Sequence, residues 1–351
     1  MHIHLIRTRY PHWCQYSGIY QFVKYVDPQQ YMINVRVASD SDEDFPIKDK
    51  FLQKWLRHQV QAKGMEWYKL SDLTAEAIAL KECWHRKIDV IHYLDGEHSA
   101  QFLPKLLKRF NRIRPKIVAT YHQPPELLDT LIDKQVISQL DSITVVCPEQ
   151  AAYFEKFVDP SKIHSILHGI DTHYFKPSNL PKKQENFKCL TVGRWLRDYE
   201  ALRRVAKALI SYKNIEFHIV TGNAQELQDL ENVTVHRGIS DLELLKLYQQ
   251  SHVLLLPLQQ STANNALLEG IACGLPVIST DLASVRAYLP GEEAILIQNN
   301  DAEQFIEALI NLMNNPTQVE AMSLAARSRA EKLSWENIAP YYENIYSKSS
   351  G

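Results

Sequence analysis

The sequence lacks a strong net charge, a cysteine framework and any long hydrophobic run. Its 39 basic and 41 acidic residues give a formal net charge of −2, which argues against a protein that binds nucleic-acid phosphates. The five cysteines are widely spaced, without a C-x-x-C pair, so they indicate neither a disulfide framework nor a zinc ribbon and suit a reducing cytosol. No run approaches the ~20 apolar residues of a membrane-spanning helix, and the amino terminus lacks a signal-peptide pattern. We therefore expect a cytoplasmic protein with at most peripheral membrane contact.

Short apolar runs alternate with longer helical patterns along the chain. A length of 351 residues favours two domains over one. Continuous apolar strands between helices are typical of parallel sheets that are buried on both faces. A polar, proline-containing stretch at 177–183 separates two such series, so the sequence predicts two doubly wound α/β domains in tandem. The expected strands are 1–8, 31–37, 88–94, 116–121, 142–147, 163–167, 187–192, 216–220, 233–236, 253–257 and 276–279.

Two segments differ from the rest in charge. The acidic, turn-rich stretch 38–50 indicates a solvated loop. The segment from Lys105 to Lys116 carries six basic residues and no acid, and the leucines within and before it have helical spacing. It is either an ordinary surface helix, which we favour, or a face that approaches anionic lipid or a phosphate-bearing acceptor.

Ligands of open α/β sheets bind beyond the carboxyl ends of the strands, so the loops there are the candidate sites. Arg194 follows an expected strand, where its guanidinium could grip a diphosphate or simply lie on the surface. A polar loop leads into a helix that begins near Asn264, and its free N–H groups could cradle a phosphate. Glu269 lies among apolar residues of that helix, so it either holds a ribose diol or forms a salt bridge. His122 also ends a strand, as an acid/base group or as an ordinary polar residue.

Several motifs from about residue 116 onward resemble those of family 4 glycosyltransferases, which are retaining, nucleotide-sugar-dependent enzymes of the GT-B fold. Their joint order makes the resemblance specific. The resemblance implies two Rossmann-like domains that face a deep cleft, with an N-terminal acceptor domain at 1–176, a C-terminal nucleotide-sugar domain at 177–332, and a final helix at 333–351 that packs back on the first domain. The motifs are TVVCPEQAAYF (144–154), HGIDTHYFKP (168–177), VGRWLRD (192–198), HRGISDLELLKLYQQSHVLLLPL (236–258), ALLEGIACGLPVIST (266–280) and SWENIAPYYENIY (334–346).

The same resemblance implies roles for single residues. Arg194 matches the arginine that grips the diphosphate, and Glu269 matches the second glutamate of the family's E-x7-E motif, which holds the donor ribose. His122 matches the histidine that contacts the transferred sugar, so His122 and Arg194 are the candidate catalytic residues. The other positions are Thr262, Ala263, Asn264 and Asn265, with Arg197, for the diphosphate; Ser261 and Thr262 for the donor sugar; Arg237, Gly238 and Ile239 for the nucleobase; and Ser17 and Gly18 for the acceptor side.

Two positions depart from the family's pattern. Ser261 stands where the first glutamate of the motif belongs, and Tyr199 stands in place of the usual lysine. The expected function is transfer of a hexose, with retention, from UDP-glucose or a related UDP-sugar to a glycan or lipid-linked acceptor in cell-envelope or exopolysaccharide synthesis. The alternative is a catalytically weakened nucleotide-sugar-binding protein. The departing phosphate oxygen could take the acceptor's proton, so no strong protein base is needed. We also expect no metal cofactor.

Two other enzyme classes rank lower. A metal-dependent GT-A transferase needs a D-x-D clamp, and the strings at 40–42 and 42–44 supply one, but a second sheet would then have no purpose. A nucleotide-sugar 2-epimerase needs acid/base groups that the sequence does not place. We also expect no nucleic-acid partner, and a location in the cytoplasm, with peripheral contact at the inner face of the membrane through the segment from Lys105 to Lys116.

Overall fold

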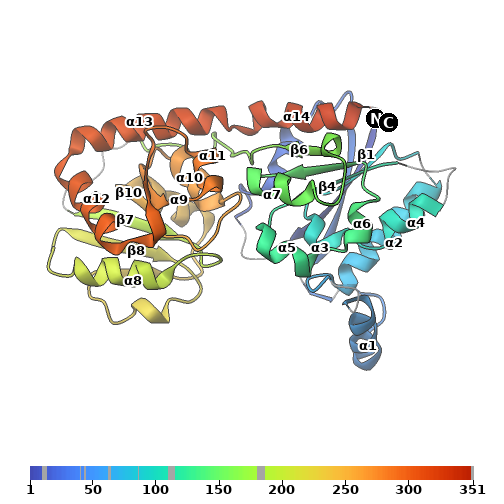
Figure 1. Cartoon of the computed structure of the whole chain (residues 1–351), viewed down its shortest axis with the longest axis horizontal. Coiled ribbons are helices and arrows are strands. Elements are labelled where there is room, and N and C mark those ends of the chain that lie inside the picture. Colours follow the sequence, from blue (N-terminus) through green and yellow to red (C-terminus); the bar gives the residue numbers. More distant parts are fainter. Residues whose placement is uncertain are drawn as a thin grey trace. The chain divides into compact units, whose positions relative to one another are not determined.

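The computed structural model describes residues 1–9, 14–39, 41–42, 45–61, 65–85, 87–109, 115–179 and 186–348. The chain divides into two compact units, each built around its own sheet (Figure 1). Residues 14–18 and 169–176, which the sequence led us to place in the N-terminal domain, group with unit 2. Unit 1 comprises Met1–Trp13, Ile19–His168 and Ile338–Gly351, and unit 2 comprises Cys14–Gly18 and Gly169–Asn337.

Unit 1 contains a parallel sheet of six strands in the order β2-β1-β3-β4-β5-β6. The sequence predicted all six, because runs such as KIVATY in β4 are apolar enough to be buried along their whole length. The chain runs outward from β1 to β2 and then returns to the other side of β1 with β3, which makes the β1–β3 junction a topological switch point. The strands are β1 (His2–Arg9), β2 (Met32–Ser39), β3 (Val90–Tyr93), β4 (Lys116–Tyr121), β5 (Ser142–Val145) and β6 (Ile163–Ser165).

Helices connect these strands and cover the sheet with an apolar core. Buried side chains of β3, β4 and β5 pack against apolar residues of α2, α4, α5 and α7. A smaller apolar cluster forms beneath α1. The helical elements are η1 (Ile19–Tyr25), α1 (Lys50–Gln61), α2 (Leu70–His85), α3 (Gly96–Ser99), α4 (Leu103–Arg109), α5 (Pro125–Leu131), α6 (Lys134–Ile137), α7 (Pro148–Phe154) and η3 (Pro160–Lys162).

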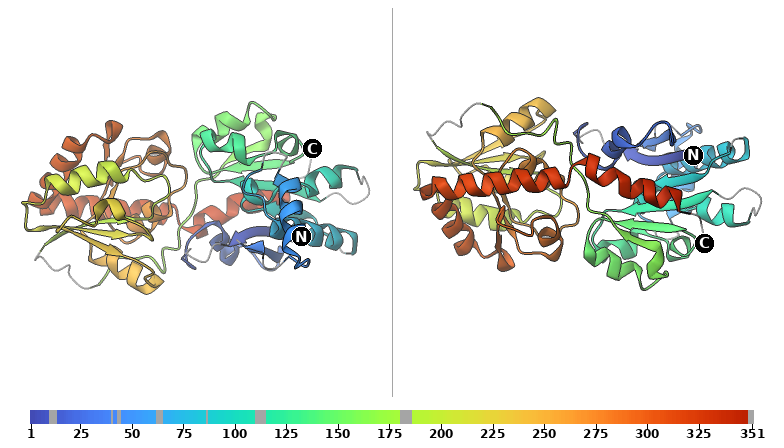
Figure 2. Two further views of the ribbon diagram at one scale, coloured as in Figure 1. Left: turned by 90° about the horizontal axis from the view of Figure 1, so that it is seen from below. Right: turned by 90° about the horizontal axis from the view of Figure 1, so that it is seen from above.

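Unit 2 repeats this design with the strand order β12-β11-β10-β7-β8-β9, again all parallel. Its switch point lies between β7 and β10, and Figure 2 shows helices on both sides of this sheet. The sequence predicted the first five strands but not β12. The strands are β7 (Phe187–Val192), β8 (Ile215–Val220), β9 (Val233–His236), β10 (Val253–Leu256), β11 (Val277–Thr280) and β12 (Ala294–Ile297).

Two helices of unit 2, α9 and α10, start at polar side chains that cap them. Ser240 and Glu243 form a capping box at the start of α9, and Asn264 caps α10. These caps fix the two helices whose side chains meet at Glu269, which is described below. The helical elements are α8 (Tyr199–Ala208), η4 (Gln225–Leu227), α9 (Asp241–Gln250), α10 (Asn265–Ala272), α11 (Ala283–Tyr288), η5 (Gln298–Asn300), α12 (Ala302–Asn314) and α13 (Pro316–Lys332).

The last helix, α14 (Trp335–Ser347), belongs to unit 1 from Ile338 onward. Tyr342 stacks on Phe22, and the hydroxyl of Tyr346 lies 2.6 Å from Nδ1 of His92. Phe22, Tyr342 and Tyr346 are aromatic and buried around His92. The helix α14 therefore forms part of the core of unit 1.

Candidate active site

Two loops meet at the switch point of unit 2. One follows β7 (residues 193–198), and the other follows β10 (residues 257–264). The backbone N–H of Asp198 donates to the carbonyl of Pro257 at 2.9 Å, and that of Gln259 donates to the carbonyl of Leu196 at 3.0 Å. These bonds hold the loop that carries Arg197 against the loop that leads into α10, at the edge of the sheet where ligands of such folds bind.

Arg197 is the structural link between the two loops. Its guanidinium donates to the carbonyls of Val192 and Trp195 and to Oδ1 of Asn264 at 3.0 Å. Gly193 has a φ of +87°, and a Cβ atom there would lie 3.3 Å from Nη2 of Arg197, so glycine suits both the turn and the packing. Burial lowers the pKa of Arg197 to about 10, which still leaves it cationic at neutral pH.

Arg194 has a different environment, on the surface of unit 2. It pairs with Glu226 at 2.5 Å, donates to the carbonyl of Asn223 at 3.1 Å, and lies over the ring of Tyr199 at 4.7 Å from the centroid. The hydroxyl of Tyr199 donates to the carbonyl of Gly193 at 3.1 Å. Tyr199 therefore supports the arginine with its ring at the position where the family pattern has a lysine.

The pair with Glu226 leads to a prediction for donor binding. Glu226→Gln should raise the affinity for a nucleoside diphosphate about two- to fivefold, because Glu226 would no longer compete with the phosphates for Arg194. The gain is small because an exposed ion pair contributes only ~0.2–1 kcal/mol. Calorimetric titration with UDP measures the change. Asp229→Asn, which breaks the neighbouring pair with Arg203, is the matched control and should leave the affinity unchanged. An unchanged or lower affinity of Glu226→Gln would show that Glu226 does not compete with the phosphates for Arg194.

The start of α10 combines a capped helix terminus with a buried polar loop. Asn264 accepts from the backbone N–H of Leu267 at 3.3 Å, and Thr262 is buried, whereas Ser261 is half-buried and donates to the carbonyl of Thr262. The N–H groups of the first helical turn have no partner within a helix, and the helix dipole favours an anion there. Of the other candidate positions in this loop, Ala263 is half-buried and Asn265 is exposed.

Glu269 is buried in α10 and is held by two hydroxyl groups. The hydroxyl of Tyr248 on α9 donates to Oε2 at 2.8 Å, and the hydroxyl of Ser17 donates to Oε1. Burial raises the pKa of Glu269 to about 7. The carboxylate thus already accepts from two hydroxyls, which is the arrangement that a vicinal diol would offer, rather than from a salt-bridge cation.

Ser17 lies in unit 2 rather than on the acceptor side of unit 1, where we expected it. The segment 14–18 is attached by three contacts: Ser17 to Glu269, the backbone N–H of Gln15 to Asp241 at 3.2 Å, and the ring of Tyr16 stacked on that of Tyr174 at 3.5 Å. Gly18 has a φ of +88° and belongs to the same segment. Long-range contacts of this kind leave no signal in local sequence.

The expected nucleobase positions follow β9. Arg237 and Gly238 are exposed and Ile239 is half-buried, and Gly238 has a φ of +60° that favours glycine. They lead directly into α9, the helix that supplies Tyr248 to Glu269. The helix α9 therefore links the loop at 237–239 to the carboxylate of Glu269.

The switch point of unit 1 holds a second group of buried polar side chains. The backbone N–H of Thr8, at the end of β1, donates to Asp95 at 3.0 Å, and the backbone N–H of His122 donates to Glu97 at 3.1 Å. Nδ1 of His122 lies 3.7 Å from Glu97 and 4.0 Å from Asp95, and its ring lies 6.0 Å from that of His168. His122 thus lies beside two acidic residues, Asp95 and Glu97, which the sequence did not lead us to include among the candidate site residues.

Burial sets the protonation of this group. It lowers the pKa of His122 well below its ordinary value, with His168 adding to the effect, so the imidazole is neutral at neutral pH. Burial raises the pKa of Asp95 to about 6, and burial together with Asp95 raises that of Glu97 to about 8. A neutral imidazole beside a protonated carboxyl can donate and accept hydrogen bonds to a sugar, but it does not supply a cation.

The prediction of one basic helix from Lys105 to Lys116 is wrong. The helix α4 ends at Arg109, and Lys116 begins β4, where its buried side chain donates to the carbonyl of Ile345 at 2.6 Å. Lys105 pairs with Asp133 at 2.5 Å. Residues 110–114 lie outside the described part of the chain. The two ends of the segment therefore do not form a continuous cationic face.

The D-x-D strings at 40–42 and 42–44 lie largely outside the described residues, which include Asp42. Its carboxylate pairs with Arg57 and accepts from the backbone N–H of Leu70. Among the residues that the structure describes, no three His, Cys, Asp or Glu side chains are grouped so that they could hold a metal ion. In the same residues, no helix has both the length and the hydropathy to cross a bilayer.

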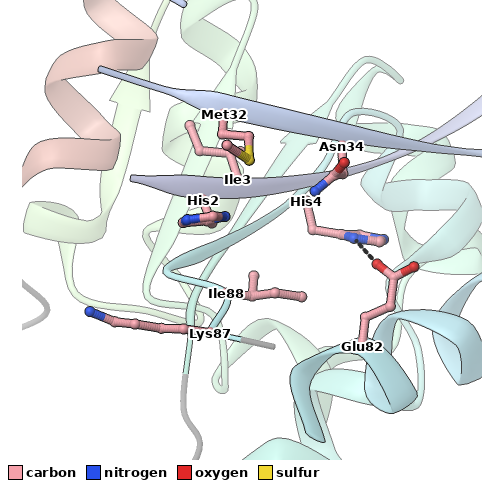
Figure 3. A pocket seen from close by; sticks show the side chains of 8 residues that line it. All are labelled: His2, Ile3, His4, Met32, Asn34, Glu82, Lys87 and Ile88. Atoms are coloured by element: carbon pink, nitrogen blue, oxygen red, sulfur yellow. Dashed lines mark ion pairs between the residues drawn. The ribbon is translucent and has the colours of Figure 1, made fainter. Parts of the chain in front are cut away.

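A pocket of about 370 Å³ opens at the amino ends of β1 and β2 in unit 1 (Figure 3). His4 and Asn34 point into it from the sheet, and Nδ1 of His4 lies 3.0 Å from Glu82 of α2. The pocket is therefore at the opposite edge of the sheet from Asp95 and His122. Parallel sheets of this kind bind their ligands at the carboxyl ends of the strands. We assign it no part in the active site.

The fold and the two switch points define a class: a chain of two Rossmann-like α/β domains. Comparison with known proteins identifies the family. Residues 32–174 match the family model described as Glycosyltransferase Family 4, and residues 186–315 match the model described as Glycosyl transferases group 1. The chain belongs to the glycosyltransferases that carry these two domains, and it has the GT-B fold.

Individual relatives agree with this assignment. The chain is 24% identical over 257 residues to a D-inositol 3-phosphate glycosyltransferase of Corynebacterium urealyticum. The matched region covers 64% of this chain and 60% of that protein. Sucrose-phosphate synthase from Thermosynechococcus elongatus has the same fold, with a TM-score of 0.73, 18% identity and 98% coverage of both chains. Anabaena Alr3699/HepE, solved in complex with UDP-glucose, has a TM-score of 0.66 and 11% identity, covering 98% of this chain and 100% of that one.

Proposed function

We propose that this protein transfers a hexose, with retention of configuration, from a UDP-sugar to a glycan or lipid-linked acceptor. The observation that carries the proposal is the geometry of unit 2, where Arg197 bonds the cap of α10 and Glu269 lies in the same helix. The spacing between the start of α10 and Glu269 suits a nucleoside diphosphate, with its phosphates at the helix start and its ribose hydroxyls on the carboxylate. UDP-glucose in the solved complex of HepE supports the choice of nucleotide.

In this mechanism unit 2 stabilises the leaving group. As the bond from the anomeric carbon to the diphosphate breaks, negative charge grows on the phosphate oxygens, where Arg194, Arg197 and the N–H groups of α10 would stabilise it. If the acceptor attacks from the face that the diphosphate leaves, configuration is retained and the departing oxygen takes the acceptor's proton. We expect no metal to be required, so EDTA should leave the rate unchanged.

Unit 1 would bind the acceptor. We assign His122 to the transferred sugar as a neutral hydrogen-bonding group, with Glu97 positioning it through its backbone N–H. Acceptors of cell-envelope or exopolysaccharide synthesis fit a transferase of this kind, and the reaction would take place on the cytoplasmic side of the membrane.

A nucleotide panel tests this proposal. UDP should raise the thermal midpoint more than GDP or ADP, because a ligand that binds only the folded state stabilises it in proportion to its affinity. UDP-glucose should also be hydrolysed slowly to free UDP in the absence of an acceptor. No stabilisation by any of the three nucleotides would contradict the proposal.

The second candidate is a nucleotide-sugar-binding protein without catalysis. Ser261 and Tyr199 favour it, because neither supplies the charge that the family pattern has at its position. Strong stabilisation by UDP-glucose without any release of UDP, even with a range of acceptors, would select this function over the transferase.

A further inference from the structure

The helix α1 exposes large apolar side chains to solvent. Phe51 is 83% exposed, Trp55 52% and Leu52 38%. They lie within one turn of each other, so they form a continuous surface that we call the α1 patch. In unit 1, α1 lies away from the sheet, beyond α2 (Figure 1). Contiguous apolar surface of this kind marks an interaction site in a folded protein.

The carboxyl-terminal half of α1 packs against unit 1, so the helix is held in place without the α1 patch. Val60 is buried and Leu56 is half-buried against a small cluster that includes Tyr68 and Leu70. At 100° per residue, these two side chains and the α1 patch occupy adjacent sectors of one apolar arc. One sector of the arc therefore holds the helix on unit 1, and the other faces solvent in the first turns.

The polar arc of α1 is cationic. The helix carries Lys50, Lys54 and Arg57 and no acidic residue. Lys50 and Lys54 are exposed, and Arg57 pairs with Asp42. The carboxylate of Asp49 caps the helix by accepting from the backbone N–H of Leu52 at 2.7 Å. A short helix with Phe, Trp and Leu on one side and lysines on the other has the composition of helices that lie in a membrane interface.

We propose that α1 docks this protein on an anionic membrane surface. Phe51, Leu52 and Trp55 would enter the boundary between headgroups and acyl chains, with Lys50 and Lys54 at the lipid phosphates. The indole of Trp55 suits this depth because it is apolar with one hydrogen-bond donor. A second copy of the chain fits less well, because pairing two α1 patches brings like charges together.

This inference relocates the membrane contact that the sequence suggested. In the segment from Lys105 to Lys116, Lys105 pairs with Asp133 and Lys116 donates to the carbonyl of Ile345 in α14. The helix α1, by contrast, offers exposed cations beside exposed aromatic rings. The proposal does not depend on the proposed transferase activity. Vesicle binding and nucleotide binding can therefore succeed or fail separately.

Cosedimentation with vesicles at low ionic strength tests the proposal. The full chain should bind vesicles of phosphatidylglycerol and phosphatidylcholine and bind pure phosphatidylcholine much more weakly. Phe51→Ser with Trp55→Ser should lower the affinity about tenfold or more. Lys50→Gln with Lys54→Gln should lower it about 25-fold on the anionic vesicles only, because each cation contributes a factor of about five.

Matched controls exclude general effects of surface substitution. Leu242→Ser with Leu324→Ser removes two exposed leucines of unit 2, which are 56% and 69% exposed, and should bind vesicles like the unmodified protein. Circular dichroism and the thermal midpoint should show that every variant is folded. Failure of the full chain to bind anionic vesicles would overturn the proposal, as would unchanged binding by the Phe51/Trp55 variant. Self-association that this variant abolishes would assign the patch to a second copy instead.

Discussion

Replacing Glu269 by alanine should weaken binding of UDP-glucose by about 10- to 100-fold. Hydrogen bonds to a charged acceptor contribute ~1.5–3 kcal/mol, and the proposed site gives the ribose hydroxyls this single carboxylate. The hydroxyls of Ser17 and Tyr248 donate to this carboxylate, so binding of the ribose would exchange hydroxyl partners rather than break a salt bridge. Isothermal titration calorimetry at mildly alkaline pH, where the carboxylate is ionised, measures the loss.

Two controls separate this effect from loss of structure. Glu269→Gln keeps the shape of the side chain and should lose much of the affinity with less effect on folding. Glu292→Ala removes an exposed carboxylate of the same unit and should change nothing. An alanine variant that is folded and binds UDP-glucose normally would remove Glu269 from the donor site.

The raised pKa of Glu269 also predicts a pH dependence of donor binding. Its value of about 7 means that the carboxylate ionises as the pH rises through neutrality, so the affinity for UDP-glucose should increase over that range. Stability should change in the opposite direction. Because this pKa lies above the unfolded value of ~4.3, the folded state binds more protons between the two values, and its stability falls as the pH rises between them.

Glu269→Gln should flatten the affinity profile, since it removes the titrating group. Titrations with UDP-glucose from mildly acidic to mildly alkaline pH provide the measurement, and thermal midpoints over the same range follow the stability. A glutamine variant with the same pH dependence as the unmodified protein would assign that dependence to another group, such as Asp95 or Glu97.

Replacing Arg194 by alanine should lower turnover by ~10²–10³ while weakening donor binding far less. The reason is that the charge on the leaving diphosphate grows in the transition state, so a donor aimed at it acts mainly on kcat. Arg194 is exposed and its ion pair is on the surface, so its loss should not unfold unit 2. Single-turnover rates and the Kd of UDP-glucose are the two quantities to compare.

Arg203→Ala is the control for this variant, because it removes another surface arginine, on α8, that pairs with Asp229. It should leave both quantities unchanged. Arg194→Lys should recover only part of the rate, since an ammonium cannot form the paired hydrogen bonds of a guanidinium. Equal losses in rate and in affinity for Arg194→Ala would contradict a role in stabilising the leaving group.

The fold could be predicted from the sequence where local patterns determine it. Runs such as those of β4 and β10 are almost entirely apolar, because both faces of the sheet are covered. These runs, alternating with helical patterns, were enough to predict the two-domain α/β architecture. The short strand β12 was missed because it has only four residues, three of them half-buried, and lies at the sheet edge. The segment from Lys105 to Lys116 was misjudged because charge alone does not show where a helix ends.

The candidate site was only partly predictable, because much of it depends on contacts between distant residues. Arg197 and Asn264 belong to motifs, but their hydrogen bond depends on the order of β7 and β10 in the sheet. Ser17 reaches Glu269 across 252 positions of sequence, and no local pattern encodes that contact. Glu97 gained its relation to His122 only once β3 and β4 were known to be neighbours.

A crystal structure of the protein with UDP-glucose would test the central claim most directly. We predict the diphosphate within hydrogen-bonding distance of Arg194 or Arg197 and of the first N–H groups of α10, with the ribose hydroxyls on Glu269. Nucleotide bound elsewhere, with Glu269 still held by Ser17 and Tyr248, would contradict the assignment of unit 2 as the donor site.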